Sequence, residues 1–301
     1  MLQRIQCRFC PLFFTLCFSF FSIVSIAQSK PTYTQQWKMV ATLETKGLHQ
    51  QAAKKVQQVF QTAVKEKNEK QWLKAALHLM RYQNLLKEFS VEKNITYIQN
   101  LLSNSTGIST PILQNLLAEL YSNYQTDHYW QISNLNLAQE ISGDFKTWTI
   151  SGFENHIKEL YLSSLQNKSL LQNTFVADYT EIVIAGSNDK KLRPTLFDVL
   201  ANQALDYFKN NNSSQPFWRE EHAQNEDHFL SDDMRTFCSR IIVLDSNSKK
   251  AHFAFQLFQQ LIQFHLNDAE PDALLDINLQ RLQFAYENSH HPLKFQHFEA
   301  Q

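Results

Sequence analysis

The chain has 301 residues, of which 43% are hydrophobic and 19% charged, and its formal net charge is −1. A near-neutral chain without a dense basic stripe has little to offer a phosphate backbone, so we expect no nucleic-acid partner. Only five glycines and seven prolines are present, which disfavours an all-β protein with its many tight turns.

The first 27 residues have the order of a secretory signal peptide. Arg4 and Arg8 lie at a basic start, an apolar stretch follows, and Ser25-Ile26-Ala27 places small residues where a signal peptidase cleaves. The alternative is a retained membrane anchor, because the apolar stretch approaches the roughly 20 residues that span a bilayer. We predict a signal peptide at 1–27 and export to the periplasm, the outer envelope or the medium, with membrane contact only through this segment.

Cleavage at Ala27 would change both charge and cysteine content. It would leave 26 basic and 29 acidic side chains, a net charge of −3, and Cys238 as the one remaining cysteine. An intramolecular disulfide is then impossible. Cys238 precedes apolar residues, and we interpret it as a buried, unreactive thiol.

Four helices are predicted directly after the leader. Their ranges are 33–46, 50–66, 69–87 and 91–104. Gly47 ends the first of them, and the short connections favour antiparallel neighbours.

A weak repeat also marks this region. Gln36-Trp37 recurs as Gln71-Trp72, and alanines such as Ala52 and Ala53 would let paired helices approach closely, as in tetratricopeptide (TPR) hairpins. An ordinary irregular bundle is the alternative. We predict an all-α fold, an array of antiparallel helical hairpins that is TPR-like or α-solenoid-like at its N-terminal end.

Further along the chain, apolar residues recur at helical spacing in four stripes, which begin at Ile112, Phe153, Leu196 and Ala254. Ser109-Thr110-Pro111 places a capping hydroxyl before a proline of the first turn. Ser231 is predicted to cap a helix whose first turn carries Asp232 and Asp233.

Three stretches interrupt the helical pattern. Residues 131–147 are predicted to form an irregular crossover. Residues 179–184 have the β-propensity of a lone strand, but without a pairing partner in a helical chain we expect a short buried helix or an extended bridge. Residues 210–231 are predicted to form a long polar loop. The predicted organisation is therefore a helical hairpin domain at 28–210, a polar loop at 211–231 and a C-terminal helical subdomain at 232–301 that packs on the first.

The histidines do not predict a metal site or a catalytic centre. His222 and His228 flank Glu226 and Asp227 within one polar loop that has no fixed geometry. His78, His156 and His265 lie on or beside apolar stripes, and we interpret each as a hydrogen-bonded core histidine. No zinc-protease, hydrolase or phosphate-binding motif is present, so we predict no catalytic residue, no cofactor and no metal.

Aromatic residues give the candidate interaction surface. Tyr121, Tyr124, Tyr129 and Trp130 cluster at the end of one predicted helix, and Phe217-Trp218 lie in the polar loop. We expect the first two tyrosines to be buried. The predicted partner surface consists of Tyr129, Trp130, Phe217 and Trp218.

Several segments together resemble one family of exported bacterial proteins. They are Gln36-Trp37, Lys46-Gly47-Leu48, 116–121, 191–198, 204–208 and 272–282. They are similar to the N-terminal helical region of Bacteroidetes-type alpha-2-macroglobulin family proteins over about residues 33–289, and Leu192-Arg193-Pro194-Thr195-Leu196 is the most specific stretch. The resemblance implies export, a protease-trapping or envelope-defence context, and macroglobulin-type domains or an envelope protein as partner.

The chain also departs from that family. It has no run of short alternating strands to supply macroglobulin domains, and Cys238-Ser239-Arg240 is not a thioester motif. No trapping residue can therefore be transferred. We expect the N-terminal module alone, as a truncated product or a stand-alone relative.

Three functions follow from this interpretation. The leading one is a non-catalytic, exported interaction module. A periplasmic helical enzyme would need His156 or His265 beside a carboxylate in an open cleft. A glycan- or ligand-binding protein would need a groove lined by Tyr124, Tyr129, Trp130 and Trp218.

Overall fold

The computed structural model describes residues 31–87, 90–135, 141, 143–182, 189–210, 228–242, 250–289 and 291–300. Within these ranges the regular structure is helical, and the one β-type pairing is an isolated bridge between Phe175 and Thr195. The predicted all-α class is confirmed. No helix in the described ranges is both long and apolar enough to cross a bilayer. The predicted leader at 1–27 lies outside these ranges.

The first half of the described chain is a series of helices joined by short turns. They are α1 (Tyr33–Thr45), α2 (His49–Glu66), α3 (Glu69–Leu85), α4 (Val91–Ser103), α5 (Ser109–Asp127), α6 (Tyr129–Ile132), the 3-10 turn η2 (Phe145–Thr147) and α7 (Ile150–Ser164). The bounds of α1–α4 agree with the predicted ranges to within two residues. Local capping explains this agreement, because the side chains of Thr32, Asn68 and Ser90 each accept a first-turn backbone N–H.

The second half contains shorter elements between three long helices. The elements are α8 (Lys168–Gln172), the 3-10 turn η3 (Val176–Tyr179), α9 (Asp189–Leu192), α10 (Leu196–Lys209), α12 (His228–Ser231), α13 (Met234–Ser239), α14 (Lys250–His265), α15 (Asp272–Asn288) and α16 (Lys294–Glu299). The stripes that begin at Leu196 and Ala254 thus form helices as predicted. Of the predicted polar loop, 211–227 lie outside the described ranges, and its last residues form α12.

Two predicted helix caps are wrong. Ser109 is the first helical residue of α5 rather than its cap, and the cap position, Ile108, makes no side-chain bond. The carboxylate of Glu69 on α3 instead accepts from the backbone N–H of Ser109 at 2.6 Å and from its hydroxyl at 2.8 Å. Ser231 ends α12, and Asp233 caps α13 by accepting from the backbone N–H groups of Arg235 and Thr236.

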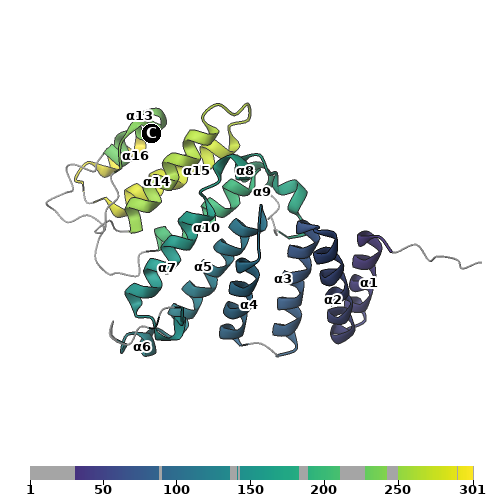
Figure 1. Ribbon diagram of the computed structural model, residues 1–301. Helices are drawn as coiled ribbons and strands as arrows, with labels where there is room; N and C mark the ends of the chain where they lie inside the picture. Colours follow the sequence, from purple (N-terminus) through teal and green to yellow (C-terminus); the bar gives the residue numbers. More distant parts are fainter. Residues whose placement is uncertain are drawn as a thin grey trace, which may run out of the picture.

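The long helices lie side by side in chain order (Figure 1). α1, α2 and α3 pack in succession, α4 packs on α5, and α5 packs on α7. α10 contacts both α7 and α14, and α14 in turn contacts α15. α8 and α9 lie near one end of α10, whereas α13 and α16 lie at the far end of the molecule from α1.

Two groups of buried side chains hold these helices together. A small cluster joins α1, α2 and α3 through aliphatic residues such as Val40, Val56 and Val59. A large cluster runs from Leu73 on α3 to Ala285 on α15 and includes most of the buried phenylalanines. The large cluster therefore extends on both sides of the predicted boundary at 211–231.

The two Gln-Trp pairs of the predicted repeat have different surroundings. The caps of α1 and α3, Thr32 and Asn68, are 36 positions apart, whereas the pairs are 35 positions apart. The indole Nε1 of Trp37 donates to the side-chain oxygen of Gln71 at 2.6 Å, so that the first pair reaches the second. Trp72 lies instead against Phe60 on α2. A regular TPR-like repeat remains a prediction.

Candidate functional site

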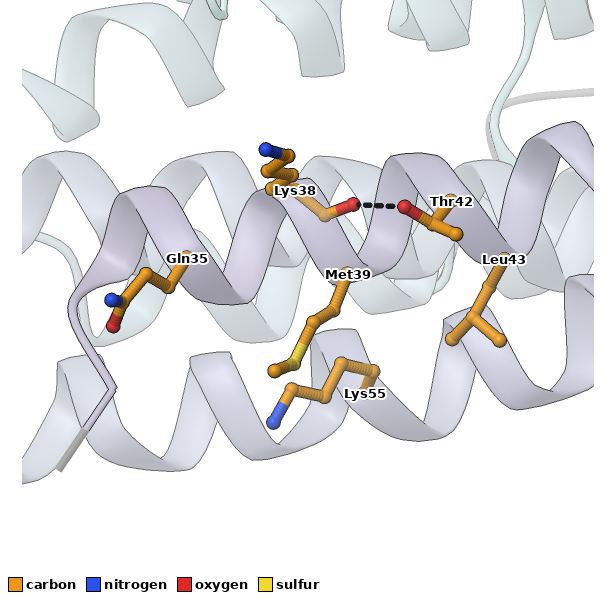
Figure 2. A pocket seen from close by; sticks show the side chains of 6 residues that line it. All are labelled: Gln35, Lys38, Met39, Thr42, Leu43 and Lys55. Carbon is orange, nitrogen blue, oxygen red and sulfur yellow. Dashed lines mark hydrogen bonds between the residues drawn. The ribbon is translucent and has the colours of Figure 1, made fainter. Parts of the chain in front are cut away.

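An apolar groove lies along the outer helices α1 and α2. Its volume is about 730 Å³, and it is lined by Gln35, Lys38, Met39, Thr42, Leu43 and Lys55. Figure 2 shows Met39 and Leu43 pointing from α1 toward α2, with the stem of Lys55 beside Met39. The Met39 side chain is 50% exposed although it is apolar. The groove can therefore accept an apolar side chain from another molecule.

The charged side chains at this groove are basic. Lys38 and Lys55 line it. The acid of the same helix, Glu44, lies toward α3, where it pairs with Arg81 and accepts a hydrogen bond from the hydroxyl of Tyr82. The groove thus combines an apolar floor with a positive border.

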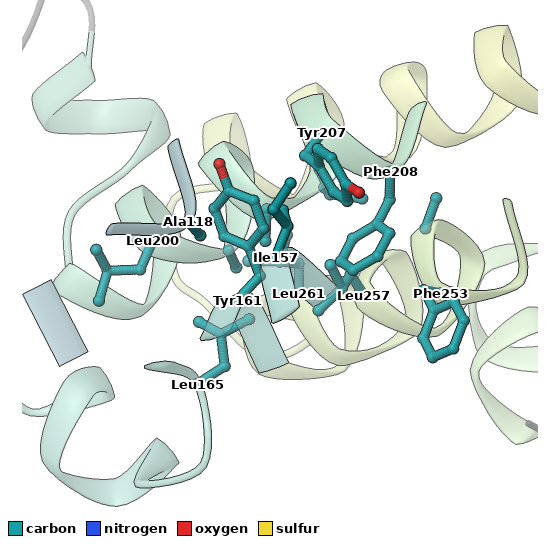
Figure 3. Close-up of a cluster of buried hydrophobic side chains, with 14 of the residues drawn as sticks. Ala118, Ile157, Tyr161, Leu165, Leu200, Tyr207, Phe208, Phe253, Leu257 and Leu261 are labelled. Atoms are coloured by element: carbon teal, nitrogen blue, oxygen red, sulfur yellow. The ribbon is translucent and has the colours of Figure 1, made fainter. Parts of the chain in front are cut away.

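A second, polar cleft of about 540 Å³ lies among α5, α7, α10 and the start of α14. Its lining includes carboxylates, amides and hydroxyls, and two tyrosines, Tyr161 on α7 and Tyr207 on α10. Their ring centroids are 5.3 Å apart, and both rings belong to the buried cluster shown in Figure 3. Polar groups from four helices therefore meet above an aromatic floor.

The two tyrosine hydroxyls are held as neutral phenols. Burial raises the pKa of Tyr161, and the carboxylates of Glu119 and Asp206 raise it further. Burial likewise raises the pKa of Tyr207, whose hydroxyl is enclosed and has no hydrogen-bond partner in the described part of the chain. The ammonium of Lys250 lies over the Tyr207 ring at 4.2 Å.

His265 lies in a third polar group, which is enclosed by the protein. Its Nε2 is 2.8 Å from a carboxylate oxygen of Asp198, and its Nδ1 is 2.6 Å from Asp268. The other oxygen of Asp198 accepts from the backbone N–H and the hydroxyl of Thr195, both at 2.8 Å. Burial acts to lower the pKa of His265, but the hydrogen bonds and charges of the two carboxylates outweigh it and raise the pKa.

This group explains part of the sequence pattern. Thr195 and Asp198 form the capping box of α10, so the Leu192–Leu196 stretch of the family resemblance ends in a structural cap. His265 is 2% exposed and Asp198 is 1% exposed. The core-histidine prediction is confirmed for His265, and the open cleft that an enzyme would need is absent around it.

The other two histidines differ from that prediction. His156 is at the surface, stacked on Trp148 with ring centroids 3.8 Å apart, and its Nδ1 is 4.0 Å from Glu159. His78 is half-buried beside Trp37, and its Nδ1 has no hydrogen-bond partner in the described chain. Burial, assisted by Arg81 and Lys74, lowers the pKa of His78 to about 4. His156 is therefore no core residue, and His78 is not hydrogen-bonded through Nδ1.

Where the chain is described, no three or more His, Cys, Asp or Glu side chains are arranged so that they could hold a metal ion. His222 lies outside these ranges, and His228 begins α12. Cys238 is half-buried, with its sulfur 3.6 Å from the carbonyl oxygen of Gln259. Burial raises the pKa of this thiol, although Arg281 opposes the effect. The thiol is thus weakly nucleophilic.

Arg281 is the largest fully buried side chain of the described residues. One guanidinium nitrogen donates to the carbonyl oxygen of Asp232 at 3.0 Å, and the group lies 4.6 Å from the Phe237 ring centroid. Its Nε and Nη2 have no partner among the described residues. Burial lowers the pKa of this guanidinium to about 10.

The predicted aromatic surface is only partly described. Tyr129 is 50% exposed and Trp130 is 80% exposed, whereas Phe217 and Trp218 lie outside the described ranges. Tyr121 and Tyr124 are buried, as expected, and pack on Phe145. Because Tyr124 faces the core, it does not join Trp130 in a common groove, and that part of the predicted glycan groove is wrong.

Sequence reasoning proposes no site role for Tyr161 or Tyr207, although both line the polar cleft. Tyr161 falls in the apolar stripe of α7 and is indeed buried. Its spacing carries no signal for the cleft, because the other wall comes from α10 and α14.

The chain was compared with family models, curated proteins and solved structures, and none of them matches it.

Proposed function

We propose that this chain is an exported, non-catalytic helical module that binds a partner protein through the groove between α1 and α2. The leader pattern at 1–27 and the resemblance to the N-terminal region of alpha-2-macroglobulin family proteins support export and an envelope-defence context. The TPR-like character of the hairpins belongs to the same proposal, since such arrays commonly serve as binding surfaces.

One observation carries the proposal, namely the exposure of Met39 at 50% within an apolar groove bordered by lysines. An amphipathic helix can place apolar side chains at i, i+3, i+4 and i+7 into such a groove. The lysines favour acidic residues along the margins of that helix, because complementary charges steer association and fix orientation. We therefore assign the groove to an acidic amphipathic helix of an exported protein.

A peptide pair tests the assignment. A fluorescent amphipathic helix with leucines on one face and glutamates on its margins is compared with a twin that carries lysines instead. We expect the acidic peptide to bind at least about tenfold more tightly by fluorescence anisotropy, a difference that corresponds to about 1.4 kcal/mol. Added salt should reduce the difference by screening the lysines.

Two matched variants test whether the peptide binds in the α1–α2 groove. Met39→Glu should abolish binding of the acidic peptide, whereas Leu279→Glu, at a 59% exposed leucine of α15, should leave it unchanged. Equal binding of both peptides, or retained binding to Met39→Glu, would contradict the assigned groove. Cell fractionation with mass determination of the mature N-terminus tests the export part separately.

A further inference from the structure

We propose that the polar cleft among α5, α7, α10 and the start of α14 is a binding site for a neutral, polyhydroxylated ligand such as a short oligosaccharide. The site is separate from the groove of α1 and α2 and does not depend on the function assigned to that groove. Its volume of about 540 Å³ lies within the roughly 300–1,000 Å³ of small-molecule sites.

Unpaired polar side chains converge on the cleft from two helices. Glu119 and Asn123 on α5 and Gln203 on α10 line it, and none of them forms a hydrogen bond or ion pair with the described part of the chain. A carboxylate accepts hydrogen bonds, whereas each amide both donates and accepts. This mixture matches ligand hydroxyls, which also donate and accept.

The floor of the cleft provides one more unpaired group. Tyr161 is 4% exposed and lines the cleft, yet its hydroxyl forms no hydrogen bond with the described residues. The hydroxyl lies near both Glu119 and Asp206, whose charges act on it. A phenol with a raised pKa stays protonated, so it can donate to a ligand oxygen while Glu119 accepts from the ligand. One oxygen of Asp206 already pairs with Lys209 at 3.1 Å, which leaves its other oxygen as a further acceptor.

The charges of the cleft exclude other ligand classes. Lys250 is the single cation among the described lining residues, and it is already occupied by Glu154 at 3.9 Å and by the Tyr207 ring. A phosphate or carboxylate ligand would find two carboxylates and no free cation. A purely apolar ligand would leave the lining amides and carboxylates without partners.

Calorimetric titration with three neutral trisaccharides, maltotriose, cellotriose and N,N',N''-triacetylchitotriose, tests the site. We expect at least one to bind with a Kd between about 1 μM and 1 mM, the range of modest small-ligand affinity. Spermidine and inositol hexaphosphate serve as cationic and anionic probes of the same cleft, and both should bind at least about tenfold more weakly.

Two substitutions assign the binding to the cleft. Tyr161→Phe removes only the hydroxyl, and Glu119→Gln changes an exposed carboxylate of α5 that lines the cleft. Each should weaken saccharide binding about tenfold. Glu159→Gln is the control, because Glu159 is an exposed carboxylate of α7 outside the cleft. Circular dichroism would show that all three variants retain the helical fold.

The proposal is overturned if none of the three saccharides binds, if spermidine binds more tightly than any of them, or if Tyr161→Phe and Glu119→Gln bind like the wild type. Met39→Glu changes the α1–α2 groove and leaves the polar cleft intact, so this variant should bind the saccharides like the wild type. Its saccharide binding therefore tests the cleft independently of peptide binding in the groove.

Discussion

The two ends of the molecule are packed with different kinds of residues. Around α1–α3 the buried side chains are mostly small and aliphatic, such as Ala52, Val56 and Ala63. Around α10–α15 the buried side chains include eight phenylalanines, whereas no phenylalanine of α1–α3 is buried, and the ionic side chains of Asp198, His265 and Arg281 are buried there as well. The first region relies on close approach of neighbouring helices, whereas the second depends on polar groups finding partners far along the chain.

The largest expected effect tests that dependence. Asp198→Ala removes the carboxylate that pairs with His265 and satisfies Thr195. The loss of one member of a buried ionic group should reduce the free energy of unfolding by about 3–5 kcal/mol. Urea denaturation measures it. Asp268→Ala, at a side chain that is 39% exposed, should reduce the free energy of unfolding clearly less. Equal losses would show that burial of the Asp198–His265 pair does not increase its contribution to stability.

The N-terminal region should respond instead to added volume. Ala63→Leu places a large side chain on α2 of the α1–α2 hairpin, at a position where Ala63 is fully buried, and overpacking should cost about 1–3 kcal/mol. Val64→Leu on the same helix changes a 51% exposed position and should stay within about 0.5 kcal/mol of wild type. Thermal denaturation compares the two. A neutral Ala63→Leu would contradict close packing of this hairpin.

Two glycine substitutions, compared with each other, test the contact between Glu69 and the start of α5. Gly107 has φ +55, and an added Cβ would lie 2.7 Å from the Glu69 carboxylate that caps α5, whereas Gly47 has φ +70 and free space around it. Gly47→Ala should cost about 1 kcal/mol because of the left-handed backbone alone. Gly107→Ala should cost more, by up to about 1 kcal/mol for the displaced cap. Equal unfolding free energies would mean that Glu69 moves aside freely.

The buried imidazole predicts a pH dependence confined to the C-terminal region. The pKa of His265 is raised in the folded protein. The charged imidazole therefore contributes fully to the free energy of unfolding below the pKa of the unfolded chain, about 6.5, and this contribution is lost as the pH rises through the folded pKa. The difference in unfolding free energy between wild type and His265→Asn should therefore shrink as the solution becomes alkaline. A difference that grows with pH would contradict the inference that folding favours the protonated imidazole.

The smallest expected effect concerns the buried guanidinium. Arg281 has two nitrogens without partners among the described residues, so its interactions only partly offset the desolvation of the charge. Arg281→Met should leave the free energy of unfolding within about 1 kcal/mol of wild type or increase it. A large loss in urea denaturation would show that this cation, like Asp198, holds the C-terminal region together.

Sequence reasoning succeeded where the determinants are local. The helices α1–α4 follow from caps and stripes within a few residues of each boundary, and their bounds were predicted closely. The caps of α5 and α13 were missed for different reasons. The partner of Ser109 lies 40 residues away on α3, and the unforeseen helix α12 places Ser231 at a helix end rather than a start.

The candidate sites were harder to predict for the same reason. Met39 looks in sequence like any core residue of an amphipathic helix, and its exposure follows from α1 having no further helix packed outside it in the described chain. Tyr161 and Glu119 lie in separate helices, and only tertiary packing brings them to one cleft. By contrast, the exposure of Trp130 agrees with its predicted role on a surface.

The separation of Asp198 and His265 has a consequence for the order of assembly. The chain is synthesised from its N-terminus, and α1–α5 can pair with sequence neighbours as soon as they emerge, since local contacts form fastest. α10 cannot complete its buried face until His265 follows 67 residues later. Until then Asp198 and the apolar side of α10 stay uncovered, which makes this interval the stage at which a nascent chain is most open to chaperones and to aggregation.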